Sequence, residues 1–129
     1  MFIRTALALA ISLSALNAQA ADLSRMAAAF GNTVLSIYPD GRSQKFWLHP
    51  NGDWEGLGRD GKTHLAGHWT LKGDEVCMRQ TAPPTLPFSY CTPFPSDPHV
   101  GVVWSSKDFG GHPITLTVVK GMPEVSSAR

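Results

Sequence analysis

Glycine-containing turn dipeptides recur at almost regular spacing along the middle of the chain, and this spacing constrains the fold more than any other feature. The four dipeptides are Asp40-Gly41, Asn51-Gly52, Asp60-Gly61 and Gly73-Asp74. Their glycines lie 11, 9 and 12 residues apart, which is typical of short strands joined by hairpins. Asp-Gly and Asn-Gly favour type I′ turns because both central residues of such a turn need a positive φ. The spacing therefore predicts an all-β fold.

Eight strands are predicted between and after these turns. They cover residues 33–38, 43–49, 53–58, 63–71, 75–79, 88–92, 100–106 and 113–119. Apolar and polar residues alternate within them, which indicates an antiparallel sheet with one buried face and one solvated face. In the segment 100–106, Val100, Val102 and Trp104 share a face. The core is predicted to contain Leu65, Trp69, Leu71, Val102, Trp104, Ile114, Leu116 and Val118.

An antiparallel meander of about eight strands either closes into an up-and-down barrel or folds over as a β-sandwich. Hairpin connections along the whole chain favour the barrel, which is the predicted fold. The Pro-rich loops Thr81–Pro87 and Pro93–Pro98 are the places where a sandwich would change sheets, so the sandwich stays an alternative.

The two ends of the chain are predicted to lie outside the barrel. Residues 1–20 combine one positive charge, a short apolar run and the small-x-small pattern Ala18-Gln19-Ala20, which together are typical of a cleaved signal peptide. An uncut membrane anchor is the alternative; after cleavage no anchor would remain. Residues 21–30 are predicted to form a short helix that ends at Gly31. The barrel would then span residues 31–120, followed by a flexible tail at 121–129.

Charge and cysteine usage narrow the function classes. Without residues 1–20 the chain has ten Lys and Arg against ten Asp and Glu. This neutrality excludes nucleic-acid binding driven by bulk charge and a polybasic membrane patch. Cys77 and Cys91 lie fourteen positions apart without CxxC spacing or a neighbouring His, so a structural disulfide is predicted rather than a reactive or metal-binding thiol pair. A disulfide and a signal peptide together predict a periplasmic or secreted protein.

Several of these motifs occur together in one known group of proteins. The motifs are Gly31-Asn32-Thr33, Phe46-Trp47 leading to Asn51-Gly52, Gly67-His68-Trp69, Gly73-Asp74-Glu75-Val76-Cys77 and the second cysteine, Cys91. With them the chain resembles small exported bacterial proteins of unknown function that are described as lipocalin-like or calycin-like β-barrels. The resemblance implies the barrel fold and, more weakly, a binding role. The chain departs from the pattern after Cys91, where Pro93-Phe94-Pro95 and Asp97-Pro98 interrupt a strand that would close the barrel.

The search for nucleotide and metal motifs is largely negative. Residues 56–61 spell GxGxxG, but that fingerprint binds phosphates only where it opens a helix, and here it leads into another strand. His64 and His68 share a strand face about 13 Å apart, which is too far for both to bind one metal ion. Pairing of either with His49 from another strand stays open. No metal site and no cofactor is predicted.

Acid–base residues give no clear catalytic pair. Asp53 and Glu55 lie two residues apart on one strand face, about 7 Å from each other, a separation that some glycosidases use. They flank Trp54, whose opposite face suits the core, so both carboxylates are predicted to face water. No catalytic residue is assigned, and the protein is predicted to be more plausibly a binding protein than an enzyme.

Aromatic residues carry the functional prediction. Trp47 and Trp54 lie on adjacent predicted strands and Tyr38 on the strand before, so these three could form one side of a ligand site at the barrel mouth. A non-catalytic barrel that binds a small apolar or aromatic ligand is the first hypothesis. The second is an envelope interaction module or inhibitor that uses the Pro-rich loops to contact a protein partner. The third is a small enzyme that uses His68 or His49 near the mouth.

Overall fold

The computed structural model describes residues 23–85 and 89–122, which form eight strands preceded by one helical turn at residues 23–26. The strands are β1 (Thr33–Ile37), β2 (Ser43–Leu48), β3 (Asp53–Leu57), β4 (His64–Lys72), β5 (Glu75–Ala82), β6 (Tyr90–Pro93), β7 (Val103–Lys107) and β8 (Pro113–Val119). The predicted all-β class is therefore confirmed, and each predicted strand overlaps an observed one.

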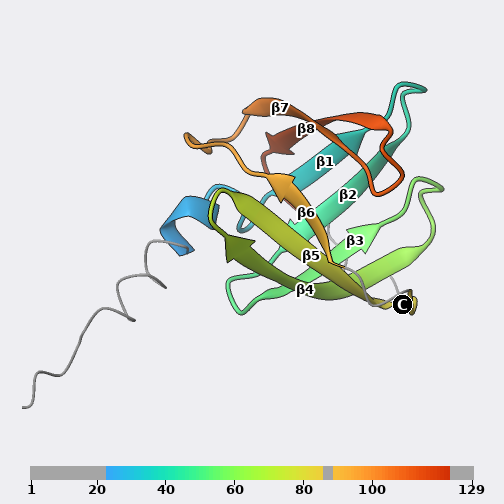
Figure 1. The fold of residues 1–129 in the computed structure, drawn as a ribbon, viewed down its shortest axis with the longest axis horizontal. Helices are drawn as coiled ribbons and strands as arrows, with labels where there is room; N and C mark the ends of the chain where they lie inside the picture. Colours follow the sequence, from blue (N-terminus) through green and yellow to red (C-terminus); the bar gives the residue numbers. More distant parts are fainter. Residues whose placement is uncertain (1–22, 86–88, 123–129) are drawn as a thin grey trace, which may run out of the picture.

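All eight strands belong to one antiparallel sheet that curls into a nearly closed barrel (Figure 1). Each strand pairs with the next along the chain from β1 to β6, and β7 pairs with β8. The first strand pairs with the last over Thr33↔Val119 to Ile37↔Thr115, which joins the two ends of the meander. A single continuous sheet confirms the barrel prediction over the sandwich alternative.

The barrel has one seam, between β6 and β7, which have no backbone ladder between them. Side chains cross the seam instead: the Tyr90 hydroxyl donates to the Lys107 carbonyl oxygen, and the hydroxyls of Thr92 and Ser106 lie 2.5 Å apart. The seam follows the Pro-rich segment after Cys91, where the sequence departs from the expected pattern. Proline has no N–H to donate, so Pro93 cannot extend a ladder on both sides.

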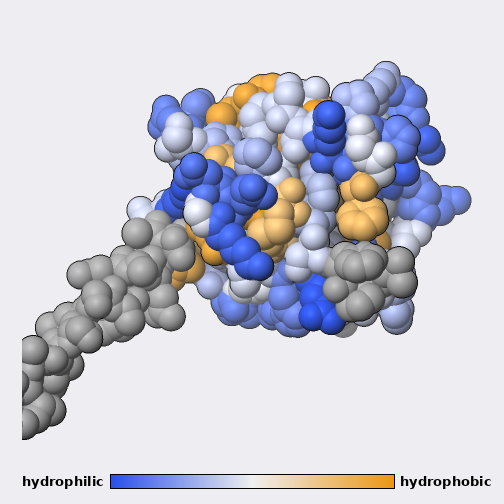
Figure 2. Space-filling model, viewed as in Figure 1, coloured by the Kyte–Doolittle hydropathy of each residue, from blue (hydrophilic) through white to orange (hydrophobic). Residues whose placement is uncertain are grey.

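The predicted core residues all face the barrel interior, whereas hydrophilic residues cover most of the outer face that Figure 2 shows. Trp69, Ile114, Leu116 and Val118 are buried, and Leu65, Leu71, Val102 and Trp104 are half-buried and packed against them. The prediction for Val100 was wrong, because its side chain is 46% exposed. Gly101 adopts a φ of +92° and the Val102 N–H donates to the His99 carbonyl, so this stretch is a turn and β7 begins only at Val103.

The segment before β1 packs against one end of the barrel (Figure 1). Met26 and Ala29 are fully buried in the core, and the Phe30 ring lies 5.9 Å from the Trp69 ring. In the described part of the predicted helix at 21–30, residues 23–26 are helical and residues 27–30 are not, so the predicted helix end was wrong. The following N–H groups donate to carbonyls three residues back, as in Ala29 to Met26 at 2.9 Å, so the chain continues in tight turns rather than as an α-helix.

A side chain from this segment fixes the same end of the barrel. The Arg25 guanidinium pairs with Asp74 in the β4–β5 turn at 3.0 Å and donates to the carbonyls of Gly73 and Phe94. The β4–β5 turn and the end of β6 are thereby held to the residues before β1. We refer to this part of the barrel as the closed end.

Cys77 of β5 and Cys91 of β6 form the predicted disulfide and lie directly opposite each other in the ladder. The predicted signal peptide at 1–20 and most of the predicted tail at 121–129 lie outside the described residues. Among the residues that are described, no helix is long and apolar enough to cross a membrane.

Candidate functional site

The barrel contains a cavity of about 480 Å³ that is partly open to solvent. Inward-facing side chains of all eight strands contribute to its wall, and most of them are apolar or aromatic. The strand residues that line it are Val34, Ser36, Gln44, Phe46, Leu48, Trp54, Leu65, Val76, Met78, Gln80, Tyr90, Thr92, Trp104, Ile114 and Leu116. Seven more lie in the connections: Tyr38, Arg59, Thr85, Phe94, Asp108, Phe109 and Gly110. The cavity is therefore a property of the whole barrel rather than of one loop.

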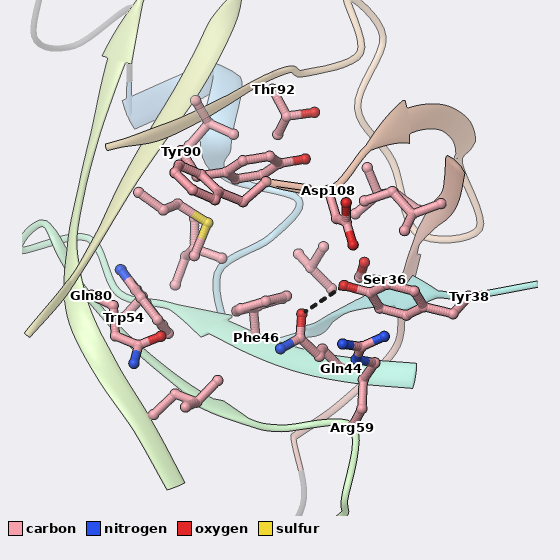
Figure 3. A pocket seen from close by; sticks show the side chains of 18 of the residues that line it. Ser36, Tyr38, Gln44, Phe46, Trp54, Arg59, Gln80, Tyr90, Thr92 and Asp108 are labelled. Carbon is pink, nitrogen blue, oxygen red and sulfur yellow. Dashed lines mark hydrogen bonds between the residues drawn. The ribbon is translucent and has the colours of Figure 1, made fainter. Parts of the chain in front are cut away.

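Strand direction decides where the polar groups of the cavity lie. β1, β3 and β7 run in the same direction, away from the closed end, because each is separated from the next by one antiparallel neighbour. Tyr38 directly follows β1, Arg59 lies in the turn after β3, and Asp108 directly follows β7. These three side chains consequently meet at the opposite end of the barrel, which we call the polar end (Figure 3).

Tyr38 lies at the centre of the polar end. Its ring is buried, and the guanidinium carbon of Arg59 lies 4.2 Å from the ring centroid in a cation–π contact. The Tyr38 hydroxyl donates to the Gln44 amide oxygen at 3.4 Å (Figure 3). Burial raises the pKa of Tyr38, and the Asp108 carboxylate and Tyr90 raise it further against the opposing effect of Arg59. Tyr38 is therefore a neutral hydrogen-bonding group at physiological pH.

Asp108 is held by its own loop. Its carboxylate accepts from the His112 backbone N–H at 2.8 Å, and the His112 Nδ1 lies 3.2 Å from both carboxylate oxygens. Partial burial opposes ionisation, but these hydrogen bonds from His112, with one from the Gly110 N–H, bring the pKa of Asp108 below its usual value. The side chain is ionised at neutral pH and only 16% exposed.

Several donors in the cavity wall have no acceptor. The Trp104 indole nitrogen is buried and donates to none of the described residues. Arg59 stacks on Tyr38 but has no carboxylate within ion-pair distance in the described part of the chain. Buried or oriented donors of this kind are satisfied by water or by a ligand.

The three residues predicted to contact a ligand do not all reach the cavity. Tyr38 and Trp54 line it. Trp54 is almost fully buried, donates from Nε1 to the His68 carbonyl at 3.0 Å, and packs edge-to-face against Phe46. Trp47 does not line it. Its neighbours on β2, Phe46 and Leu48, face inward, so its ring lies on the outer face, where Nε1 donates to the Thr33 hydroxyl at 2.9 Å.

Other cavity residues were not predicted. Gln44 and Gln80 share the inner face with Phe46 and Met78, and strand alternation alone would have placed them there. Polar residues are mostly exposed in proteins, but these two are half-buried in the cavity wall. Arg59 and the other turn residues lie outside the strands, where the alternation of polar and apolar residues does not apply. The sequence therefore did not indicate that these residues meet at one end of the barrel.

The histidines and carboxylates considered for catalysis lie on the outer face. The His68 Nδ1 is 2.9 Å from an Asp53 oxygen and the His49 Nε2 is 3.8 Å from a Glu55 oxygen. All four are part of a half-exposed to exposed surface, away from the cavity. Within residues 23–85 and 89–122, no three His, Cys, Asp or Glu side chains are grouped so that they could hold a metal ion.

The GxGxxG segment forms a hairpin, as its context predicted. Gly56 belongs to β3, and Gly58 and Gly61 belong to the turn that leads into β4. The turn is closed by the Asp60 carboxylate, which accepts from the backbone N–H groups of Lys62 and Thr63. No helix follows, so the segment lacks the helix N-terminus that would bind a phosphate.

No protein-family model, curated protein or solved structure matches this chain. The fold is compatible with the lipocalin-like resemblance at the level of a nearly closed eight-stranded antiparallel barrel. Function must therefore be argued from the cavity itself.

Proposed function

We propose that this protein is an exported, non-catalytic barrel that binds a small apolar or aromatic molecule inside the barrel. The observation that carries the proposal is the cavity of about 480 Å³, with apolar walls and a few polar groups at one end. Ligand sites in proteins typically have about 300–1,000 Å³ and this distribution of apolar and polar groups.

The volume argues against a barrel that is merely filled by its own side chains. Well-packed cores contain few voids larger than one water molecule. The cavity is many times the roughly 30 Å³ that a water molecule occupies in the liquid. Aromatic walls from Phe46, Trp54, Tyr90 and Trp104 offer stacking and edge contacts to a flat or branched apolar body.

Export is supported by the disulfide between Cys77 and Cys91 together with the signal-like segment 1–20. Disulfides persist in oxidising compartments and are rare in the cytosol. We expect cleavage after Ala20. N-terminal sequencing of the protein from a bacterial periplasm tests this, and a mature chain that begins at Met1 or Phe2 would contradict it.

Tryptophan fluorescence tests the binding proposal, because Trp54 and Trp104 line the cavity and Trp47 does not. Naphthalene and indole serve as uncharged aromatic probes, and their binding is measured in parallel by calorimetry. Trp47→Phe should keep the emission change caused by naphthalene, whereas Trp54→Phe should lose a large part of it.

The control is chemically matched, since both variants replace one buried tryptophan with phenylalanine. Native mass spectrometry of the protein from its own host would reveal a retained ligand. If neither probe perturbs emission or releases heat, and no small molecule copurifies, the binding function is wrong. The envelope interaction module would then be tested by crosslinking to protein partners.

A further inference from the structure

The polar end of the cavity has hydrogen-bond donors that have no acceptor among the described residues. The Arg59 guanidinium carries five N–H groups, and its contact with Tyr38 is through the ring face and uses none of them as a conventional hydrogen bond. The Gln44 amide oxygen accepts from Tyr38, while its amide nitrogen donates to none of the described residues. Both side chains line the cavity (Figure 3).

Acceptors at this end are already engaged. An ionised carboxylate has about four acceptor sites. Those of Asp108 receive the His112 backbone N–H, the His112 ring and the Gly110 N–H. Asp108 therefore serves to close its loop, and most of its acceptor sites are already engaged there.

We propose that the ligand of this cavity carries an anionic head group, a carboxylate, which pairs with Arg59 at the polar end while its apolar body lies among the aromatic walls. The proposal rests on the binding function proposed above. A guanidinium presents paired N–H groups that match the two oxygens of a carboxylate. Stacking on Tyr38 limits the side-chain freedom of Arg59, so less conformational entropy is lost when it pairs with the head group.

An ammonium head group is the opposite possibility, because the Asp108 charge lies nearby. The engaged acceptor sites of Asp108 disfavour it, and so does the positive charge of Arg59 beside Tyr38. A neutral head group can accept a hydrogen bond from Arg59 but leaves the guanidinium charge paired only with water. The carboxylate is the class that satisfies the unused donors without creating an unpaired charge.

Three compounds with one common body separate these possibilities: 4-phenylbutyrate, 4-phenylbutyramide and 4-phenylbutylamine. At pH 7 they are an anion, a neutral molecule and a cation. Calorimetric titration of the full mature protein at low salt should give the acid roughly tenfold tighter binding than the amide, which corresponds to about 1.4 kcal/mol. Because Arg59 is exposed, added salt should reduce this ratio.

Two variants in the same hairpin turn provide the matched comparison. Arg59→Gln should bring the acid and the amide to about equal affinity. Lys62→Gln removes the same charge from the same turn, but Lys62 does not line the cavity, so the preference for the acid should remain. Arg59→Lys keeps the charge but not the paired N–H groups and should retain only part of the preference.

The outcomes distinguish this inference from the function on which it rests. Equal binding of the acid and the amide, tightest binding of the amine, or a preference for the acid that survives Arg59→Gln would overturn the carboxylate proposal while leaving a binding barrel. Failure of all three compounds together with naphthalene and indole would overturn the binding function itself.

Discussion

Replacing Gly67 with alanine should destabilise the barrel through a direct clash with the neighbouring strand. Gly67 lies where the register between β4 and β5 shifts, between Ala66 and Gly67. A Cβ atom there would lie 1.9 Å from the carbonyl oxygen of Arg79 and 2.8 Å from Nε1 of Trp54. The first atom is backbone and the second belongs to a buried indole that donates to the His68 carbonyl, so neither can move freely.

The magnitude follows from the displacement that the methyl group would require. Carbon–oxygen contacts across sheets lie at about 3.3–3.6 Å, so β4 and β5 would have to separate locally by more than about 1 Å. Overpacking of a core costs typically ~1–3 kcal/mol and occasionally more. Because a ladder must open and the Trp54 ring must shift as well, we expect about 3 kcal/mol for Gly67→Ala.

Gly73→Ala supplies the control. Gly73 adopts a φ of +59° in the β4–β5 turn, and a Cβ atom there would meet nothing within 4 Å. Its cost is the left-handed backbone alone, about 1–2 kcal/mol. Urea denaturation followed by circular dichroism, without reductant, compares the two variants. If Gly67→Ala loses no more stability than Gly73→Ala, the close approach of Arg79 and Trp54 does not restrict residue 67 to glycine.

Three further predictions concern stability. Trp69→Ala should cost about 3–5 kcal/mol, since it deletes a buried ring, and a loss below ~1 kcal/mol in urea denaturation would place the ring at the surface. Replacing Cys77 and Cys91 together with serine should cost about 3 kcal/mol, and thiol labelling of the unreduced, denatured wild type should find no free thiol. Hydrogen bonds from Thr63 lower the pKa of Asp60 from 3.8 to about 2, and the bond from the Thr63 hydroxyl has the largest effect. This stabilisation is present above about pH 4 and lost as the pH falls through 2. The urea midpoints of Asp60→Ala and wild type should therefore differ at neutral pH and converge towards pH 2.

The strands could be predicted because most turns between them contain a recognisable glycine dipeptide. Gly41, Gly52, Gly61 and Gly73 all adopt a positive φ, between +59° and +93°. The predicted type I′ geometry was wrong, because the non-glycine residue of each dipeptide does not adopt a positive φ. Each such glycine fixes where one strand must end and the next begin. The start of β7 was predicted wrongly because Gly101 is not part of a turn dipeptide such as Asp-Gly or Asn-Gly. The turn around Gly101 was therefore assigned to the strand.

The site could be predicted only in part. Tyr38 and Trp54 were expected near a ligand and do line the cavity. Trp47 was included because its strand is adjacent to that of Trp54, but adjacency does not decide which face a side chain occupies. Trp47 and Trp54 are not directly opposite in the ladder: Trp47 pairs with Glu55 on the outer face and Trp54 pairs with Leu48 on the inner face. A register between the two strands was needed, and sequence periodicity within one strand does not supply it.

The near-neutral charge of the chain without residues 1–20 excludes partners that are bound through bulk charge. That inference holds for steering over long distances, which the net charge governs. It does not hold at contact distance, where an effective dielectric of about 20 makes two unit charges 4 Å apart worth about 4 kcal/mol, against about 1 kcal/mol in bulk water. The two arginines near the barrel ends illustrate the difference. Arg25 at the closed end pairs with Asp74 and donates to backbone carbonyls, and so contributes to the fold. Arg59 at the polar end is held against the Tyr38 ring and has no carboxylate partner among the described residues. Its charge is therefore available to a ligand in the cavity.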